Sequence, residues 1–284
     1  MRMHNSLPFR FCRRVPLLFL FASGVFAQAP GNVSTPPPTP QQTSKAVNLP
    51  LNPALPTVFI VGDSTGRNQA DLGWGDHLAQ LFDTNRINVA NRAIAGRSSR
   101  TYIEEGHWSD VLAEMKPGDY VLLQMGHNDG GALDGLKARG SLKGLGEETK
   151  DVTLPDGRTD TVHTYGWYMR KYIADARMKS ATPILLTLTI RNIWSNNGDA
   201  KPKIERDMGY GAALRQLAAN ESVQLIDISD VEADRLEALG PAKTAELFPI
   251  DHTHTSSAGA ELVAESVVQA LGESHSPLAE YLVR

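Results

Sequence analysis

The sequence predicts an α/β fold in which helices cover both faces of a parallel β-sheet. Short apolar runs rich in β-branched residues alternate along the chain with segments whose apolar residues recur at helical spacing. Strands that alternate with helices are usually joined in parallel, and a parallel sheet needs cover on both faces. Of the 284 residues, 41% are apolar and 21% are charged, which is an ordinary globular composition.

Five apolar runs are the predicted strands of this sheet. They lie at residues 57–61, 87–90, 120–125, 184–189 and 223–228. Pro183 stands at the start of the fourth run, where a strand tolerates a residue without an N–H. Between the runs, helical spacing predicts helices around residues 74–82, 168–176, 214–218 and 256–270, and Ser256 or Ser257 can cap the last of them.

Residues 140–163 break this alternation. Turns are indicated at residues 142–146 and 155–157, and the β-prone residues Val152, Thr153 and Leu154 lie between them. We interpret the segment as an inserted hairpin or long loop at the rim of the sheet.

The N-terminal 54 residues are predicted to lie outside this domain. Arginines at the start precede a short apolar run at residues 15–26, and small residues around Ala27 fit a secretory signal peptide of residues 1–27. That run is shorter than the ~20 residues that span a bilayer, and no later run is long enough. Residues 28–54 are rich in Pro, Thr and Gln and indicate a linker. We therefore expect export to the periplasm or beyond, with one domain at residues 55–284.

Charge and cysteine content exclude several classes of function. Loss of residues 1–27 removes four arginines and no acidic residue, so the formal net charge changes from −4 to −8. Such an acidic chain is a poor nucleic-acid binder, because that binding depends on neutralising phosphates. The single cysteine, Cys12, leaves with the signal peptide, which leaves no thiol for a disulfide, a nucleophile or a metal site. Nothing in the sequence requires more than a monomer.

A polar cluster at residues 62–65 follows the first predicted strand. Ser64 stands at a strand-to-helix turn, where its hydroxyl would be exposed at the top of the sheet and its N–H would face a developing oxyanion. Taken alone, the cluster fits an ordinary helix cap better than a catalytic turn.

Two more polar clusters follow the second and third strands. Gly96 can bring its N–H close to a ligand without a side chain in the way. The side-chain amide of Asn128, in the segment Gly-His-Asn-Asp, can supply another hydrogen bond to an oxyanion. Each residue alone also fits a simple turn.

The last cluster lies just before the C-terminal helix. Asp251 can reach Nδ1 of His254 while Nε2 of His254 faces Ser64, which is the arrangement that a nucleophilic serine needs. Two alternatives stay open on these residues: a metal site made by Asp251, His252 and His254, and a surface loop with histidines.

Together, the four clusters resemble the conserved blocks of the SGNH (GDSL-type) hydrolases, in the order of that family. Residues 248–256, 126–129 and 163–168 are similar to the rhamnogalacturonan acetylesterase branch, also called carbohydrate esterase family 12. The resemblance covers residues 57–271. It implies a three-layer α/β/α sandwich with a five-stranded parallel sheet, as in flavodoxin-like folds.

The resemblance also implies a role for each matching residue. Ser64 would be the nucleophile, His254 the general base and then acid, and Asp251 the carboxylate that orients the imidazole. The N–H groups of Ser64 and Gly96 and the amide of Asn128 would form the oxyanion hole. The reaction would pass through an acetyl-serine intermediate, with no cofactor and no metal.

Contacts with an acetylated pectic substrate are expected from the neighbouring residues. Arg97 and Arg100 can reach a galacturonate carboxylate or can simply be solvated at the surface, and His252 can line the cleft. Three aromatic residues can stack on sugar rings, and each fits core or helix packing equally well: Trp74, Tyr165 and Trp167. The alternatives are an esterase for acetylxylan or another acetylated oligosaccharide, a GDSL-type lipase or thioesterase with an apolar channel, and a binding module that has lost catalysis.

Overall fold

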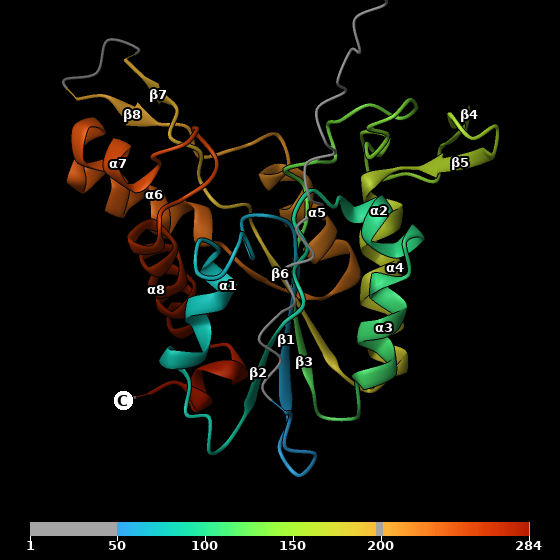
Figure 1. The fold of residues 1–284 in the computed structure, drawn as a ribbon. Helices are drawn as coiled ribbons and strands as arrows, with labels where there is room; N and C mark the ends of the chain where they lie inside the picture. The colour runs from blue at the N-terminus through green and yellow to red at the C-terminus, as the bar shows by residue number, and fades with distance from the viewer. Residues whose placement is uncertain (1–49, 197–200, 284) are drawn as a thin grey trace, which may run out of the picture. The chain divides into compact units, whose positions relative to one another are not determined.

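The computed structural model describes residues 50–196 and 201–283 (Figure 1). The predicted signal peptide, Cys12 and the predicted linker up to residue 49 lie outside the described residues.

A five-stranded parallel sheet forms the centre of the domain, and its strand order is β2-β1-β3-β6-β9. The strands are β1 (Thr57–Gly62), β2 (Asn88–Asn91), β3 (Tyr120–Gln124), β6 (Thr182–Leu186) and β9 (Gln224–Ile226). Each overlaps one of the five predicted runs, so the predicted parallel sheet is confirmed. The fourth strand ends at Leu186 rather than at residue 189, and Pro183 is its second residue.

Alternate residues of β1 point to opposite faces of the sheet and enter two separate cores. Phe59 and Val61 pack on one side, and Val58 and Ile60 pack on the other. The first side is covered by α2 (Ser99–Glu104), α3 (His107–Glu114), α4 (Tyr165–Met178) and α5 (Gly211–Glu221) (Figure 1). The second side is covered by α1 (Trp74–His77), the 3-10 turn η1 (Leu78–Leu81), α8 (Ser257–Glu273) and η2 (Pro277–Tyr281). This is the expected three-layer sandwich.

The helix caps explain where the two longest helices begin. The Ser256 hydroxyl accepts a hydrogen bond from the Gly259 N–H at the start of α8, as predicted. At α4, Thr164 accepts in the same way from the Trp167 N–H. The predicted helix around residues 74–82 is only α1 followed by η1, because the backbone becomes extended at Phe82 to enter β2.

Several elements have no counterpart among the sequence predictions. Helices α2 and α3 are short and are separated by Gly106, whose φ of 86° requires the left-handed conformation. The others are α6 (Ile228–Leu239), α7 (Pro241–Leu247), and the short strands β7 (Trp194–Ser195) and β8 (Lys203–Ile204). Helix α6 has 12 residues and was missed, whereas each of the other segments has at most 8 residues, too few for spacing alone to reveal a helix or strand.

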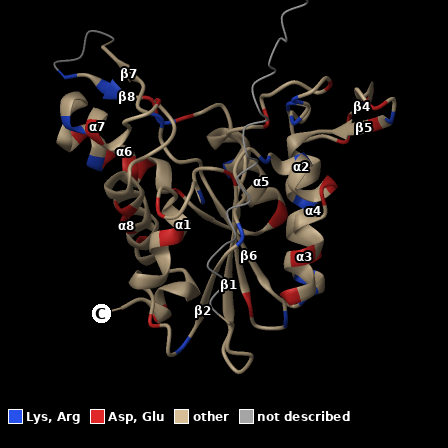
Figure 2. Ribbon diagram, in the orientation of Figure 1, with Lys and Arg blue, Asp and Glu red and all other residues tan. Residues whose placement is uncertain are grey.

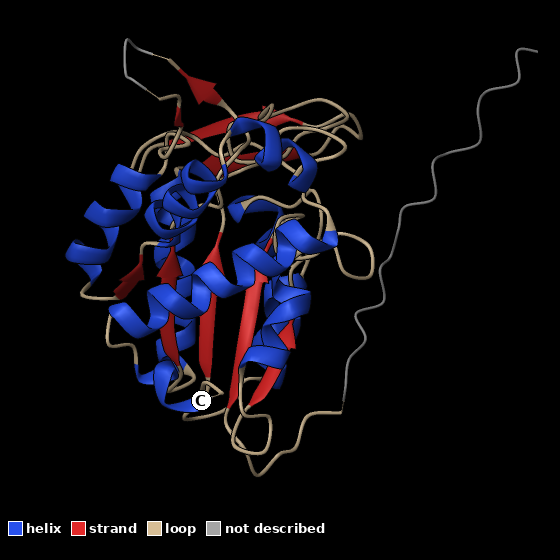
Figure 3. Ribbon diagram, turned by 90° about the vertical axis from the view of Figure 1, so that its left-hand side faces the viewer, coloured by secondary structure: helices blue, strands red, loops and turns tan. Residues whose placement is uncertain are grey.

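The predicted insertion at residues 140–163 is confirmed as an antiparallel hairpin of β4 (Thr149–Thr153) and β5 (Thr159–His163). Figure 1 shows it beside α2, at the same end of the sheet as the loops that follow the strands. In Figure 3 the strands lie side by side behind their helices, and the antiparallel pairs β4–β5 and β7–β8 lie among the loops at this carboxyl end. Parallel strands present their polar loops at this edge, where ligands usually bind.

Lys and Arg residues are interspersed with Asp and Glu residues over both helical layers (Figure 2). Within the ranges 50–196 and 201–283, no helix has both the length and the apolar character needed to cross a membrane.

Candidate active site

Ser64 lies in a tight turn directly after β1. The Asp63 carbonyl accepts hydrogen bonds from the N–H groups of Gly66 at 3.2 Å and Arg67 at 3.1 Å. The buried Asp63 carboxylate accepts from the Thr65 N–H at 2.9 Å and from the Thr65 hydroxyl at 3.0 Å. Burial raises the pKa of Asp63, although these hydrogen bonds oppose the rise. The two neighbours of Ser64 are thus fixed inward, and Ser64 itself stays partly exposed.

The buried side-chain amide of Gln124 supports this turn through hydrogen bonds. The Gln124 side-chain oxygen accepts from Trp74 Nε1 at 2.8 Å and from the Thr65 hydroxyl at 3.2 Å. Its amide nitrogen donates to the Thr187 carbonyl at 2.9 Å on the next strand's loop. Trp74 is only 1% exposed. The prediction that Trp74 stacks on a sugar is therefore wrong, because the indole is a core residue that braces the Ser64 turn.

Three of the predicted site residues form a continuous chain of hydrogen bonds. Nε2 of His254 lies 2.9 Å from the Ser64 hydroxyl oxygen, and Nδ1 lies 2.7 Å from Oδ2 of Asp251. The second carboxylate oxygen of Asp251 accepts the N–H groups of Thr253 at 2.7 Å and His254 at 2.8 Å. These distances are within reach for proton transfer. A loop from the C-terminal part of the chain is thus joined to the turn after the first strand.

The ionised state of Asp251 defines the role of each imidazole nitrogen. Partial burial opposes ionisation, but hydrogen bonds from the His254 ring and from two N–H groups lower the Asp251 pKa to about 2. An ionised carboxylate only accepts, so Nδ1 of His254 donates to it. Nε2 is then free to accept the Ser64 proton.

The side chains of this loop are not arranged as the ligands of the alternative metal site. Among the residues that the structure describes, no three His, Cys, Asp or Glu side chains are grouped as ligands of a metal ion. Both Asp251 oxygens instead face His254 and its backbone. His252 is exposed beside the triad, and its carbonyl accepts the Asn192 N–H at 2.7 Å.

Three hydrogen-bond donors lie in the loops after β1, β2 and β3. The N–H groups of Ser64 and Gly96 donate to no acceptor within the described part of the chain. Gly96 has a φ of 80°, a left-handed conformation that favours glycine. The Asn128 amide donates to the Arg97 carbonyl at 2.8 Å and lies 3.5 Å from Oδ2 of Asp63. Asn128 thereby ties the loop of Gly96 to the turn of Ser64.

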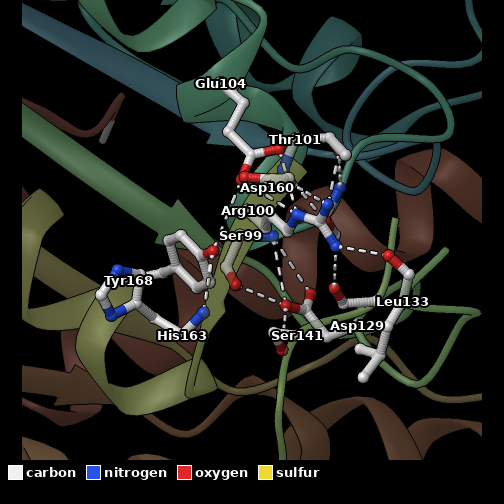
Figure 4. Close-up of polar contacts among 12 residues, drawn as sticks. Ser99, Arg100, Thr101, Glu104, Asp129, Leu133, Ser141, Asp160, His163 and Tyr168 are labelled. Atoms are coloured by element: carbon white, nitrogen blue, oxygen red, sulfur yellow. Dashed lines mark hydrogen bonds and ion pairs between the residues drawn. The ribbon is translucent and has the colours of Figure 1, made fainter. Parts of the chain in front are cut away.

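A buried aspartate, which sequence reasoning missed, holds two of these loops together. Asp129 accepts the Ser99 N–H at 3.2 Å, the Ser99 hydroxyl, and the Ser141 hydroxyl at 2.9 Å (Figure 4). The Tyr172 hydroxyl of α4 donates to the Ser99 carbonyl at 2.9 Å. Burial raises the Asp129 pKa to about 6, against these hydrogen bonds. The only signal in the sequence was its position next to Asn128.

Two further predicted substrate contacts are wrong. Arg100 is 1% exposed and is bound by Glu104 at 2.9 Å, by Asp160 of the hairpin and by two carbonyls (Figure 4). A guanidinium so enclosed is not available to a substrate carboxylate, and it instead anchors the hairpin to α2. Tyr165 is also buried, and its hydroxyl donates to the Met125 carbonyl at 2.8 Å inside the core, so its ring cannot stack on a sugar.

The other predicted contacts are partly exposed. Arg97 is paired with Glu105 at 2.8 Å and keeps 26% of its side chain exposed. Trp167 stacks on His163 with ring centroids 3.7 Å apart, so one ring face is already covered. His252 lies next to the triad, as expected from its place in the sequence.

Two basic side chains near Asn128 were not predicted. Nε2 of His127 lies 3.0 Å from the Thr189 hydroxyl, and its Nδ1 is buried without a partner in the described residues. Burial, together with the charges of Arg191 and His254, lowers the His127 pKa to about 3, so this imidazole is neutral. Arg191 donates weakly to the His127 carbonyl at 3.4 Å.

Comparison with known proteins supports the catalytic reading of this geometry. The model of the GDSL-like lipase/acylhydrolase family matches residues 60–262, which is most of the chain. This chain belongs to the GDSL-like lipase/acylhydrolase family. It is therefore a carboxylic ester hydrolase, and its fold is that of the SGNH hydrolases predicted from the four polar clusters.

Individual relatives of this hydrolase are also similar over most of its length. A rhamnogalacturonan acetylesterase from Emericella nidulans is 33% identical over 228 residues, which cover 80% of this chain and 89% of the relative. A probable rhamnogalacturonan acetylesterase, YesY, from Bacillus subtilis is 32% identical over 236 residues, which cover 80% of this chain and 97% of the relative.

A solved structure confirms the fold. The crystal structure of the Bacillus subtilis protein YxiM superposes on this hydrolase with a TM-score of 0.63 at 26% sequence identity. The match covers 81% of this chain and 59% of YxiM, so this hydrolase corresponds to little more than half of that protein.

Proposed function

We propose that the protein is a rhamnogalacturonan acetylesterase-like enzyme that removes acetyl groups from a pectic polysaccharide. The observation that carries the proposal is the hydrogen-bonded chain from Asp251 through His254 to Ser64, with distances of 2.7 and 2.9 Å. The relatives that carry the same activity in their names extend over 80% of the chain, which supports the choice of substrate class.

In this proposal, Ser64 and His254 act in two successive acyl transfers. The Ser64 oxygen attacks the acetyl carbonyl carbon while its proton passes to Nε2 of His254. The bond to the sugar oxygen then breaks, and His254 returns the proton to that oxygen. A water molecule gives a proton to His254 and attacks acetyl-Ser64; the bond to the Ser64 oxygen breaks, His254 returns the proton to that oxygen, and acetate leaves. Asp251 stabilises the imidazolium at each stage.

The oxyanion of each tetrahedral intermediate would be held by the N–H groups of Ser64 and Gly96 and by the Asn128 amide. Two observations support this role. The two N–H groups are without acceptors in residues 50–196 and 201–283. One hydrogen of the Asn128 amide is held by the Arg97 carbonyl at 2.8 Å, and the other has only a 3.5 Å contact with Asp63, which an oxyanion can replace. A donor that is already oriented costs no reorganisation when the negative charge develops.

Acetate release from a panel of substrates tests the proposal. The panel contains acetylated rhamnogalacturonan, acetylated xylan, and aryl esters of increasing acyl chain length. We expect the highest kcat/KM on the pectic substrate and loss of activity in Ser64→Ala, with Ser109→Ala, a change at an exposed serine of α3, as the matched control.

The same panel decides between the alternative substrates. A preference for acetylated xylan would replace the pectic assignment by another carbohydrate esterase. A preference for long acyl chains would contradict the carbohydrate proposal and favour a lipase or thioesterase. Full activity in Ser64→Ala would contradict the mechanism itself.

We also propose that the protein is exported and acts outside the cytoplasm as a monomer. Support comes from the basic and then apolar pattern of residues 1–27 and from the class of substrate, a wall polysaccharide. N-terminal sequencing of the protein recovered from the culture medium or periplasm should begin at Gln28. Recovery of a cytoplasmic chain that keeps its first residues would contradict this.

A further inference from the structure

Arg191 lies on the loop that follows β6, between two loops of the candidate active site. The next residue along, Asn192, donates its N–H to the carbonyl of His252 beside the triad, at 2.7 Å. Arg191 itself donates through Nη2 to the carbonyl of His127, at 3.4 Å. The preceding N–H, of Ile190, is held at 3.0 Å by the carboxyl group of buried Glu232. Arg191 is therefore fixed where the Asn128 loop and the triad loop meet.

The guanidinium of Arg191 has no carboxylate partner in the described part of the molecule. Its Nε is buried without any hydrogen-bond partner there, and its one contact, with the His127 carbonyl, is long. By contrast, Arg97 and Arg100 are each paired with a carboxylate. Burying a donor of a charged group without a partner costs free energy, so the unpaired Nε requires an explanation, and a bound ligand supplies one.

The charge of Arg191 acts on two groups next to candidate site residues, Asp63 and His127. It lowers the pKa of Asp63, which precedes Ser64, although burial raises that pKa overall. It also contributes, after burial, to the low pKa of His127, which precedes Asn128. Since His127 is neutral, Arg191 carries the positive charge at this side of the triad. The buried Nδ1 of His127 is a second polar atom left without a partner in the described residues.

We propose that Arg191 binds the carboxylate of a uronic acid residue in the substrate and so selects anionic, pectic chains over neutral ones. This inference rests on the proposed function and adds the residue that would determine its specificity. The planar guanidinium suits a carboxylate because it offers parallel N–H donors. Arg191 thus takes the role that the sequence had suggested for the buried Arg100, and Arg97 stays a predicted contact as well.

A matched pair of substrates tests the role of Arg191. Acetylated rhamnogalacturonan fragments are compared with the same fragments after methyl esterification of their carboxylates, which removes the charge and keeps the acetyl groups. For Arg191→Gln we expect kcat/KM on the charged fragments to fall about 10- to 100-fold, since one charge-assisted interaction is lost. On the methylated fragments and on a neutral aryl acetate, the change should stay within about threefold.

Two further variants control the experiment. Arg191→Lys keeps the charge and should recover part of the loss on charged fragments. Arg177→Gln also removes an arginine that donates to backbone carbonyls, but at the C-terminal end of α4. It should leave kcat/KM unchanged on both the charged and the methylated fragments.

Each outcome separates the inference from the function on which it rests. An equal loss on charged and methylated fragments would make Arg191 a support of the loop and would overturn the inference while leaving the esterase proposal intact. An unchanged kcat/KM on charged fragments would overturn it as well. A wild-type enzyme that releases no acetate from either kind of fragment would overturn the proposed function, and the inference with it.

Discussion

His254 contacts both of the other residues of the candidate triad, and its two ring nitrogens have opposite tasks. The tautomer follows from Asp251, whose pKa of about 2 keeps the carboxylate ionised at any pH where the enzyme would work. Hydrogen bonds from the His254 ring and backbone and from the Thr253 N–H produce this low value. Proton transfer between Ser64 and Nε2 then needs no rearrangement of the loop.

At the same scale, Asn128 offers a test of the oxyanion hole. Replacing it by Ala removes one donor, and kcat should fall about 10²- to 10³-fold with a smaller change in KM, because the lost interaction strengthens only in the transition state. Steady-state kinetics on an aryl acetate measures the effect, and circular dichroism checks the fold. A rise in KM as large as the fall in kcat would show that the amide also binds the substrate in its ground state.

Individual residues also show which features the sequence could predict and which it could not. Ser64, His254 and Asn128 were singled out because their clusters stand at the ends of predicted strands or before a helix, and the family resemblance implied their roles. Trp74 and Arg100 were misassigned because residue type does not reveal burial: both are 1% exposed, and each is held by internal partners that lie far away in sequence. Arg191 was missed because an arginine without a partner looks like any other until its neighbours are known.

Among the secondary-structure elements, the start of α2 fixes the loop that carries Gly96, because its first residue is bound to the loop after β3. Ser99, its first residue, is bound by Asp129 through both its N–H and its hydroxyl. Ser98 caps the helix, so the chain from Gly96 to Ser99 has little freedom. This arrangement predicts that Ser99 positions the Gly96 N–H without touching the substrate.

Ser99→Ala tests this positioning role. The variant keeps the N–H bond but loses the hydroxyl, so we expect kcat to fall about tenfold while KM changes little. Ser99→Thr, which restores a hydroxyl, should recover part of the activity, and Ser109→Ala in the exposed part of α3 serves as the control. If Ser99→Ala lowers the melting temperature and leaves kcat unchanged, the serine contributes to stability alone.

The elements that sequence patterns predicted are those with a long or uniform apolar period. The five strands, α4 and α8 meet this condition, and so does the hairpin, whose turn residues flank β-prone ones. Helices α2, α3, α6 and α7 were not predicted, because they are short or carry polar residues on most of their surface. Their positions depend on tertiary partners, such as the Trp108 indole that donates to Asp175 of α4 at 2.9 Å.

For the molecule as a whole, one buried acid makes stability depend on pH. Glu232 is fully buried, and burial raises its pKa to about 8 against the hydrogen bond from the Ile190 N–H. The folded protein keeps this proton up to about pH 8, whereas the unfolded chain releases it near 4.5. Between these values the folded state binds more protons, so the free energy of unfolding falls as pH rises.

Glu232→Gln should flatten this pH dependence. The amide cannot ionise, so the variant should lack a loss of up to about 5 kcal/mol that the wild type undergoes between pH 4.5 and 8. Urea unfolding at both pH values measures the difference, with Glu261→Gln on the exposed face of α8 as the control. Parallel pH curves for wild type and Glu232→Gln would show that Glu232 is ionised in the fold.

Ser64 should be the one serine of the chain that reacts as an activated nucleophile. Labelling with a fluorophosphonate, followed by intact-mass measurement and peptide mapping, tests it most directly. We expect one adduct per chain, on Ser64, absent from Ser64→Ala and strongly slowed in His254→Ala. An adduct on a different residue, or labelling that persists unchanged in Ser64→Ala, would show that Ser64 is not the nucleophile.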